Sequence, residues 1–284
     1  FLESRVGRID ALVAKKCALL DTLREKRAAL VTHTVTRGLP PDAARAAGLD
    51  PHPRFKDSGV EWIGEVPEYW SAAQIRRFSN YTTSGSRGWA EHYADQGPIF
   101  VRIGNLTRHS IRVDLSDVQR VEAPAGAEGE RTRIQKGDLL VSITAYLGSV
   151  AVAKDEIVGA FINQHIALVR LNQGYLLSEF AGYVILSDVG QTQLAGQGYG
   201  GTKIQLALDD VRSVWLPIPP LPEQRAIAAY LDRETSRIDA LAAKVESAID
   251  RLHEYRTALI TAAVTGRIDV RNAHQARVPS EVSA

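Results

Sequence analysis

Acidic side chains that could serve hydrolytic chemistry are scattered through the middle of the chain. Carboxylates that hold a metal ion or activate water act in groups that share one site. The available residues are Asp114, Asp117, Asp138 and the pair Asp209–Asp210, and their spacing assigns none of them to such a group. A nuclease or hydrolase is therefore an alternative without a motif, and the sequence predicts no catalytic residue.

Motifs for nucleotide and metal binding are incomplete. There is no Gly-x-x-x-x-Gly-Lys-Ser/Thr phosphate loop and no Asn/Asp-Pro-Pro-aromatic motif. The glycine-rich stretch 196–201 lacks the preceding strand and following helix of a dinucleotide loop. His92, His109 and His165 lack metal-ligand spacing, and the single cysteine, Cys17, excludes an internal disulfide. We expect neither a metal nor a cofactor on this chain.

Composition indicates an ordinary globular protein. Apolar residues make up 45% of the 284 positions and charged residues 24%, which allows a sizeable core. The net charge of +1 excludes a protein that coats nucleic acid through charge alone, so any DNA binding needs a local patch. We find neither a signal peptide nor an apolar run of the roughly 20 residues that span a bilayer. We expect a cytoplasmic location and no membrane contact.

An internal repeat sets the elements that must position these side chains. Residues 8–15 match residues 237–244 at an offset of 229, which stays constant to Thr36 and Thr265. Apolar or long-stemmed residues recur in both copies with the three-four spacing of a coiled coil. These positions are Ile9, Leu12, Lys16, Leu19, Leu23, Lys26 and Leu30, then Ile238, Leu241, Val245, Ala248, Leu252, Tyr255 and Leu259. We predict two long helices that pair in antiparallel orientation.

The residues between the helices have a different pattern. Strand-like runs occur at 99–103, 138–143, 149–152 and 165–171, with glycines between them. Residues 178–194 have apolar side chains at helical spacing. The predicted fold class is α+β, in which a mixed α/β globular domain is flanked by the antiparallel coiled coil.

Two segments at the borders of the globule carry a family resemblance. Residues 219–225, Pro-Pro-Leu-Pro-Glu-Gln-Arg, lead into the second helix, and Lys56–Trp70 contains Trp-Ile-Gly at 62–64. Together with Lys136–Ser142, Asn163–His165 and the duplicated helices, they resemble the specificity subunits of Type I restriction-modification systems. The resemblance covers almost the whole chain. We also expect Trp62 and Trp70 to pack the globule onto the helices rather than stack on bases.

The resemblance implies a division of the chain into family regions. Members of the family usually carry two target-recognition domains and two conserved helical regions. This chain resembles the C-terminal half, because Phe1–Glu3 align with Tyr230–Asp232 inside a conserved region. The expected parts are a central helix at 1–38, a linker at 39–58, a target-recognition domain at 59–216, a second helix at 217–268 and a polar tail at 269–284.

The resemblance also implies the function and the partners. The target-recognition domain would recognise one half of a split site in double-stranded DNA, and the helices would set the half-site spacing. Modification subunits, which carry S-adenosylmethionine and methylate adenine, would dock on the helices, and a restriction subunit would join through the complex. The chain itself would be a non-catalytic subunit. Two copies could pair to supply both halves of the site.

Base recognition needs cations for guanine and amides for adenine, held on loops that reach a groove. Polar loops with such residues lie in five parts of the globule. The candidate DNA-binding residues are Ser84, Ser86, Arg87, Arg102, Asn105, Thr107, Arg108, Thr144, Tyr146, Asn163, Gln164, Gln197, Tyr199 and Lys203. The alternative is a coiled-coil scaffold with an inserted protein-binding domain. A salt-dependent affinity for duplex DNA would distinguish the two functions.

Overall fold

The computed structural model describes residues 2–85, 87–123, 126–197 and 205–268. They form two compact units, one of residues 28–232 and one of 2–27 with 233–268. The helices α1 (Leu2–Arg37) and α7 (Leu221–Val264) contribute residues to both units. No helix within the described ranges is long and apolar enough to cross a membrane.

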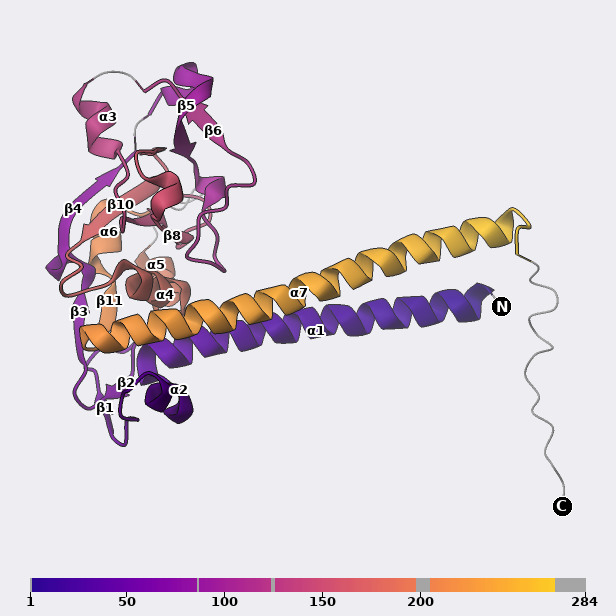
Figure 1. Cartoon of the computed structure of the whole chain (residues 1–284), viewed down its shortest axis with the longest axis horizontal. Coiled ribbons are helices and arrows are strands. Elements are labelled where there is room, and N and C mark those ends of the chain that lie inside the picture. The colour runs from indigo at the N-terminus through magenta and orange to yellow at the C-terminus, as the bar shows by residue number, and fades with distance from the viewer. Residues whose placement is uncertain (1, 86, 124–125, 198–204, 269–284) are drawn as a thin grey trace. The chain divides into compact units, whose positions relative to one another are not determined.

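The unit of residues 2–27 and 233–268 is a helical pair, and Figure 1 shows α1 and α7 side by side there. Arg27 Nε lies 2.9 Å from Asp239 Oδ1, and Arg256 Nε lies 2.8 Å from Asp10 Oδ1. The partner number rises from 239 to 256 as the α1 number falls from 27 to 10, so the helices are antiparallel. The predicted antiparallel pairing is confirmed.

The seam between the helices differs from the predicted one at alternate positions. Ile9, Leu23, Val245 and Leu259 are buried as expected, but Leu12, Leu19, Leu241 and Tyr255 are between 43% and 55% exposed. The residues buried or half-buried in the seam in their place are Val13, Leu20 and Arg27 on α1, and Ala242, Ile249 and Arg256 on α7. Both phases share every second position, and the sequence favoured the one richer in leucine. The observed phase accepts Arg27 because its stem is buried while its head pairs with Asp239.

The other unit is built on small sheets. β4 (Ser79–Ser84), β10 (Ile166–Leu171), β7 (Leu139–Ser142) and β8 (Val150–Val152) form an antiparallel sheet in that order. β6 (Gln119–Val121), β5 (Tyr93–Val101) and β9 (Phe161–Ile162) form a second sheet, in which β5 and β9 are parallel. β1 (Phe55–Asp57) pairs with β2 (Glu65–Pro67), and β3 (Ser71–Gln74) pairs with β11 (Trp215–Ile218). The predicted strands correspond to β5, β7, β8 and β10.

Short helices complete this unit. They are α2 (Pro41–Ala46), α3 (Ala127–Thr132), α4 (Ser178–Leu186), α5 (Asp188–Gln197) and α6 (Leu208–Ser213). The helix predicted at 178–194 is thus two helices, which Ser187 separates with an extended backbone. The expected linker at 39–58 contains α2 and β1. The domain boundaries themselves stay a prediction.

In the four-stranded sheet, β7 and β8 are buried on both faces. Leu139 and Val141 of β7 face one core, which α4, α5, residues Val31 and Val35 of α1, and Ile227 and Leu231 of α7 complete. Leu140 of the same strand faces a second core with Ile166 and Leu168. Alternate side chains of a strand point to opposite faces, so a strand buried on both faces needs an uninterrupted apolar run. This explains the Leu-Leu-Val sequence at 139–141.

Candidate DNA interface

Three loops and the segment before α6 meet at a polar cleft of about 300 Å³. The loop after β4 supplies Arg87, the loop between β7 and β8 supplies Thr144, and the turn between β9 and β10 supplies Gln164 and His165. Gln205, which forms an isolated bridge with Thr144, completes the lining. The cleft therefore gathers residues that lie far apart in the sequence.

Gly85 allows two of these loops to approach. A Cβ atom at this position would lie 2.1 Å from the carbonyl oxygen of Asn163 and 2.2 Å from that of Ile162. Both obstacles are backbone atoms, so no side-chain rotation could relieve the contact. The absence of a side chain at Gly85 is what brings the loop of Arg87 against the turn of Gln164.

Hydrogen bonds fix the polar groups of the cleft. Thr144 Oγ1 lies 2.9 Å from His165 Nδ1, and His165 Nε2 lies 3.2 Å from the Gln164 amide nitrogen. The backbone N–H of His165 donates to Asn163 Oδ1 at 3.1 Å. Arg87 is exposed. The cleft thus offers a cation and two amides, the side chains that pair with guanine and adenine edges in the major groove.

Of the sequence candidates, Arg87, Thr144 and Gln164 line this cleft directly. Ser84 lies at the end of β4, and its carbonyl accepts a hydrogen bond from Arg131 Nη1 at 3.0 Å. His165 belongs to the same turn as the candidate Gln164. Gln205 was not among the candidates, because no local pattern marks it and its place depends on a bridge across the fold.

A second group of candidates is occupied by contacts within the protein. Arg102 Nη2 lies 2.8 Å from Asp117 Oδ2. Asn105 is buried, and its amide nitrogen donates to the carbonyls of Asp114 and Asp117 at 2.8 Å each. These residues close the loop 102–117, and they border a separate cavity of about 310 Å³. The hydrogen bonds of Asn105 give this residue a structural role, because they hold the loop closed.

Thr107 and Arg108 of this group belong to the loop's own framework as well. Thr107 forms a bridge with Val150, and its hydroxyl accepts the N–H of Ser110 at 3.1 Å. Arg108 donates from Nε and Nη2 to the carbonyl of Leu147 at 3.0 and 2.6 Å. The candidates Ser86, Tyr199 and Lys203 lie outside the described residues. Gln197 ends α5, and nothing is described of its side chain.

The loop between β7 and β8 is held closely. Ser142 Oγ and Ser149 Oγ both donate to the carbonyl of Tyr146, the latter at 3.0 Å. Gln191 donates to the carbonyl of Gly148 at 3.0 Å. Ala145, with φ +55°, is the non-glycine residue of the described chain that has a positive φ. The Tyr146 side chain is 72% exposed beyond this network.

The aspartates considered for hydrolysis have structural partners. The buried Asp138 accepts two bonds from Arg170, each 2.8 Å, and the N–H of Gln135 at 2.7 Å. Hydrogen bonds from the side chain and backbone of Ser116 lower the pKa of Asp114. Asp210 accepts the N–H of Ala207 at 2.6 Å. Within the described ranges, no three histidine, cysteine or acidic side chains gather as a group that could hold a metal.

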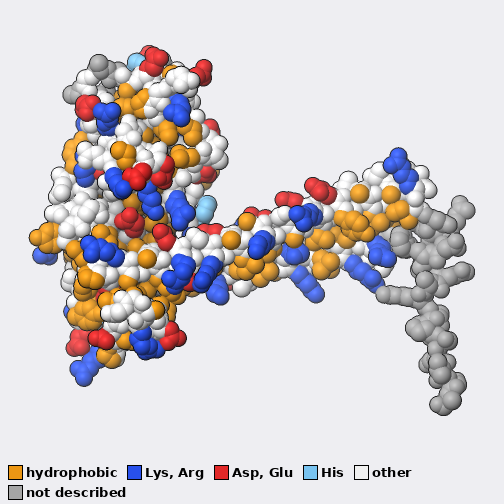
Figure 2. Space-filling view, viewed as in Figure 1, with side chains coloured by type: hydrophobic (Ala, Val, Ile, Leu, Met, Phe, Trp, Pro, Cys, Tyr) orange, Lys and Arg blue, Asp and Glu red, His pale blue; other side chains and the backbone are white. Residues whose placement is uncertain are grey.

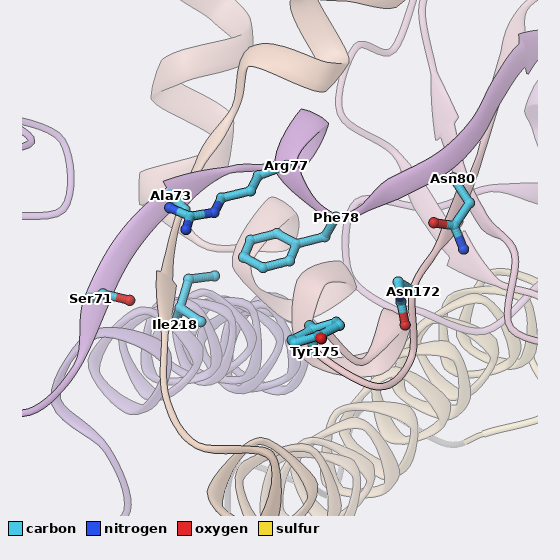
Figure 3. Close-up of a pocket in the computed structure, with 8 residues that line it drawn as sticks. All are labelled: Ser71, Ala73, Arg77, Phe78, Asn80, Asn172, Tyr175 and Ile218. Carbon is cyan, nitrogen blue, oxygen red and sulfur yellow. The ribbon is translucent and has the colours of Figure 1, made fainter.

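Another cavity, of about 360 Å³, lies at the opposite end of the β4–β10 strand pair (Figure 3). Its walls come from β3, β11, the turn before β4 and the loop after β10. Figure 3 shows the rings of Phe78 and Tyr175 on its walls, with Arg77 and Asn80 nearby. It shares no lining residue with the polar cleft.

The segment that resembles the family's helix entry fastens α7 to the globular unit. Glu223 Oε1 lies 2.5 Å from His52 Nε2, and Glu223 Oε2 accepts the Trp70 Nε1–H at 3.0 Å. Gln224 accepts the N–H of Leu177 at 2.9 Å and donates to the carbonyls of Tyr175 and Pro219. Trp70 is fully buried, which confirms its predicted packing, whereas Trp62 is 47% exposed and that prediction was wrong.

Comparison with known proteins finds similarity to one family. Residues 126–251 match the model of the Type I restriction modification DNA specificity domain. The chain is thus similar to the specificity subunits of Type I restriction-modification systems. The matched residues include β7, β8, β10, the turn of Gln164 and the start of α7. This similarity agrees with the sequence prediction of a specificity component.

The relatives are distant and longer. The chain is 21% identical over 207 residues to the Type I restriction enzyme EcoBI specificity subunit of Escherichia coli, covering 72% of this chain and 43% of that protein. It is 22% identical to the EcoKI specificity subunit of Escherichia coli strain K12, covering 72% and 44%. The chain thus spans less than half the length of these two relatives.

A solved structure shares the fold. The match is to a chain from a structure described for complex assembly and conformational transition of the type I R-M system, with a TM-score of 0.58 and 19% identity. The match covers 92% of this chain and 58% of that one. The likeness at this identity establishes the α+β fold with its long helices.

Proposed function

We propose that this specificity subunit recognises one half of a split DNA target through the polar cleft of Arg87, Thr144, Gln164, His165 and Gln205. The observation that carries the proposal is the cleft itself. The fold brings a cation and two amides from separate segments to one place, in a family whose model is named for DNA specificity. Arginine pairs with guanine and glutamine with adenine through two hydrogen bonds each.

The test is selection of a methylated sequence. The chain is combined with the modification subunit from the same source, S-adenosylmethionine and a randomised duplex library, and methylated adenines are located by sequencing. We expect a defined motif. Arg87→Ala should relax one position of it, because a two-bond base contact contributes about 1–3 kcal/mol, or roughly fivefold to 150-fold. Arg45→Ala, an exposed arginine on α2, is the matched control.

Two results would contradict parts of the proposal. Co-purification with the modification subunit but no duplex affinity at low salt would favour the scaffold function. If Arg87→Ala weakens binding equally for all sequences and reduces its salt dependence, Arg87 contacts phosphate and not a base.

The symmetry of the helices supports the proposed role in half-site spacing. Asp10 and Asp239 are equivalent in the repeat, and so are Arg27 and Arg256. The pair Asp10–Arg256 is therefore the symmetry mate of Asp239–Arg27. Two helices related in this way have equivalent ends, as a two-fold interface does.

The C-terminal end of α1 and the N-terminal end of α7 are packed into the core of the globular unit. Val35 of α1 and Leu231 of α7 are fully buried in the globular unit. The repeat equivalent of Val35 is Val264, which is 77% exposed. We infer that the helix region around Val264 receives a second recognition domain, from a longer chain or from a second copy. About 50 Å of α7 separates Leu231 from Val264, at 1.5 Å per residue.

Exposed apolar residues on the helices suit the docking of modification subunits. Leu12 and its repeat equivalent Leu241 are 49% and 46% exposed. Figure 2 shows apolar side chains between Lys and Arg side chains along the helices. The proposal includes a restriction subunit that joins through the complex, S-adenosylmethionine on the modification subunit, and action in the cytoplasm, where the DNA lies.

A further inference from the structure

The loop between β7 and β8 presents one aromatic side chain on a backbone that the fold holds in an unusual conformation. Ala145 has φ +55°, and such a conformation in a non-glycine residue is maintained only when surrounding contacts determine it. The next residue, Tyr146, is 72% exposed. The ring is therefore accessible to a partner molecule, and tyrosine is among the residue types enriched at the centre of interfaces.

Hydrogen bonds hold the backbone around Tyr146 in place. Its carbonyl accepts hydroxyl bonds from Ser142 and Ser149, which are 0% and 2% exposed. The N–H of Ser149 in turn donates to Ser142 Oγ at 2.9 Å. On the other side, Arg108 binds the carbonyl of Leu147 with two donors. The ring is therefore presented from a fixed base, so ordering the loop on binding costs little.

The loop that carries Tyr146 also contributes to the cleft for which DNA binding is proposed. Thr144, two residues before Tyr146, lines the polar cleft and contacts His165 at 2.9 Å. Hydrogen-bonding groups in the cleft can distinguish guanine and adenine, but a thymine is recognised through apolar contact with its 5-methyl group. The described cleft residues are polar, and the same loop carries the exposed aromatic ring of Tyr146 next to the exposed Ala145.

We propose that Tyr146 is a specificity-determining residue that packs its ring against the methyl group of one thymine in the target half-site. The inference rests on the proposed function, since it requires duplex DNA in the cleft. The proposal also gives Arg108, Ser142 and Ser149 a positioning role. These residues position Tyr146 and do not themselves contact bases.

The experiment removes the methyl group without changing the base pairing. The complex of the full chain with its modification subunit is titrated by fluorescence anisotropy with the selected duplex. It is then titrated with duplexes in which each thymine in turn is replaced by deoxyuridine. We expect one replacement to weaken binding about fourfold, the equivalent of burying one methyl-sized group.

Variants assign that effect to the ring. Tyr146→Ala should lose about the same affinity on the selected duplex and become insensitive to that one replacement, while its salt dependence stays unchanged. Tyr146→Phe should behave as the wild type, because the ring and not the hydroxyl makes the contact. Tyr175→Ala, which removes a 64% exposed tyrosine from the other cavity, should match the wild type at every position.

Other outcomes overturn the proposal. A Tyr146→Ala variant with wild-type affinity and the wild-type replacement profile shows that the ring does not contact the DNA. A uniform loss with reduced salt dependence indicates a backbone contact, and a loss of co-purification with the modification subunit indicates a protein contact. If the wild-type complex itself binds no selected duplex, the proposed function fails first.

Discussion

The carboxylate of Glu223 joins α7 to the segment that opens the globular domain, and its removal provides a sharp test of that joint. The Glu223 side chain is 5% exposed and lies against His52, Trp70 and Tyr69. Trp70 is 0% exposed and the His52 side chain 6% exposed, so Glu223→Ala leaves both with polar groups that water does not reach. Tyr69 is 59% exposed and can bind water instead.

The expected loss follows from these two buried partners. A buried polar group without a partner costs about 1–3 kcal/mol, and breaking a buried charged contact costs about 3–5 kcal/mol. We expect Glu223→Ala to lower the free energy of unfolding by about 3–5 kcal/mol, and Glu223→Gln, which keeps the shape, by roughly half as much. Glu254→Ala, an exposed position on the same helix, should change it by less than about 0.5 kcal/mol.

Urea unfolding followed by tryptophan fluorescence measures the effect, because Trp70 lies in the joint. A Glu223→Ala protein within about 0.5 kcal/mol of the wild type, with the same dependence on urea, would refute the reasoning. It would mean that His52 and Trp70 find other partners and that the helix is held by apolar packing alone.

Three further substitutions test other parts of the domain. Arg170→Ala removes the guanidinium that pairs with the fully buried carboxylate of Asp138, and it should lower the free energy of unfolding in urea by about 3–5 kcal/mol. Lys136→Ala removes an exposed ion pair and should leave the urea midpoint unchanged. Burial, and then the charge of the neighbouring carboxylate, raises the pKa of Tyr69 to about 12. The stability linked to its protonated phenol is thus complete below pH 10.0 and is lost as the pH rises through about 12, and the phenolate absorbance lost in Tyr69→Phe should report that pKa. Gly85→Ala places Cβ 2.1 Å from a backbone oxygen and should abolish duplex affinity, whereas Gly104→Ala meets no atom within 4 Å and should retain it.

The scaffold was predictable from the sequence because its signals are local or repeated. The offset of 229 and the three-four spacing predicted a helical pair, and the ion pairs of Arg27 and Arg256 confirm it. The phase of the seam was not predictable from apolar content. Leu12 and Leu19 are more hydrophobic than the Arg27 that lies in the seam, and only the partner carboxylate on the other helix explains that choice.

The candidate site was predictable only in part, because it forms between segments that are distant in the chain. Composition marks Arg87, Thr144 and Gln164 as residues that can contact DNA, but it marks Asn105 equally. What separates them is the surrounding structure, since Asn105 satisfies three backbone groups of its own loop and Arg87 faces the cleft. A residue type gives the capacity to recognise a base, and burial decides whether that capacity is available.

The joint and the cleft differ in how far a substitution at each is expected to disturb the fold. Glu223 and Gln224 each bind several groups that lie on other elements, so a change at either position disturbs the helix and the globule at once. The cleft side chains Arg87 and Gln164 project from loops whose backbones are fixed by other residues, Gly85 among them. If the cleft binds DNA as proposed, we expect substitution of the projecting side chains to alter which bases are bound while the fold stays intact. On the same proposal, a new DNA target would require changes at the cleft alone and would leave the docking surface of the helical pair unchanged.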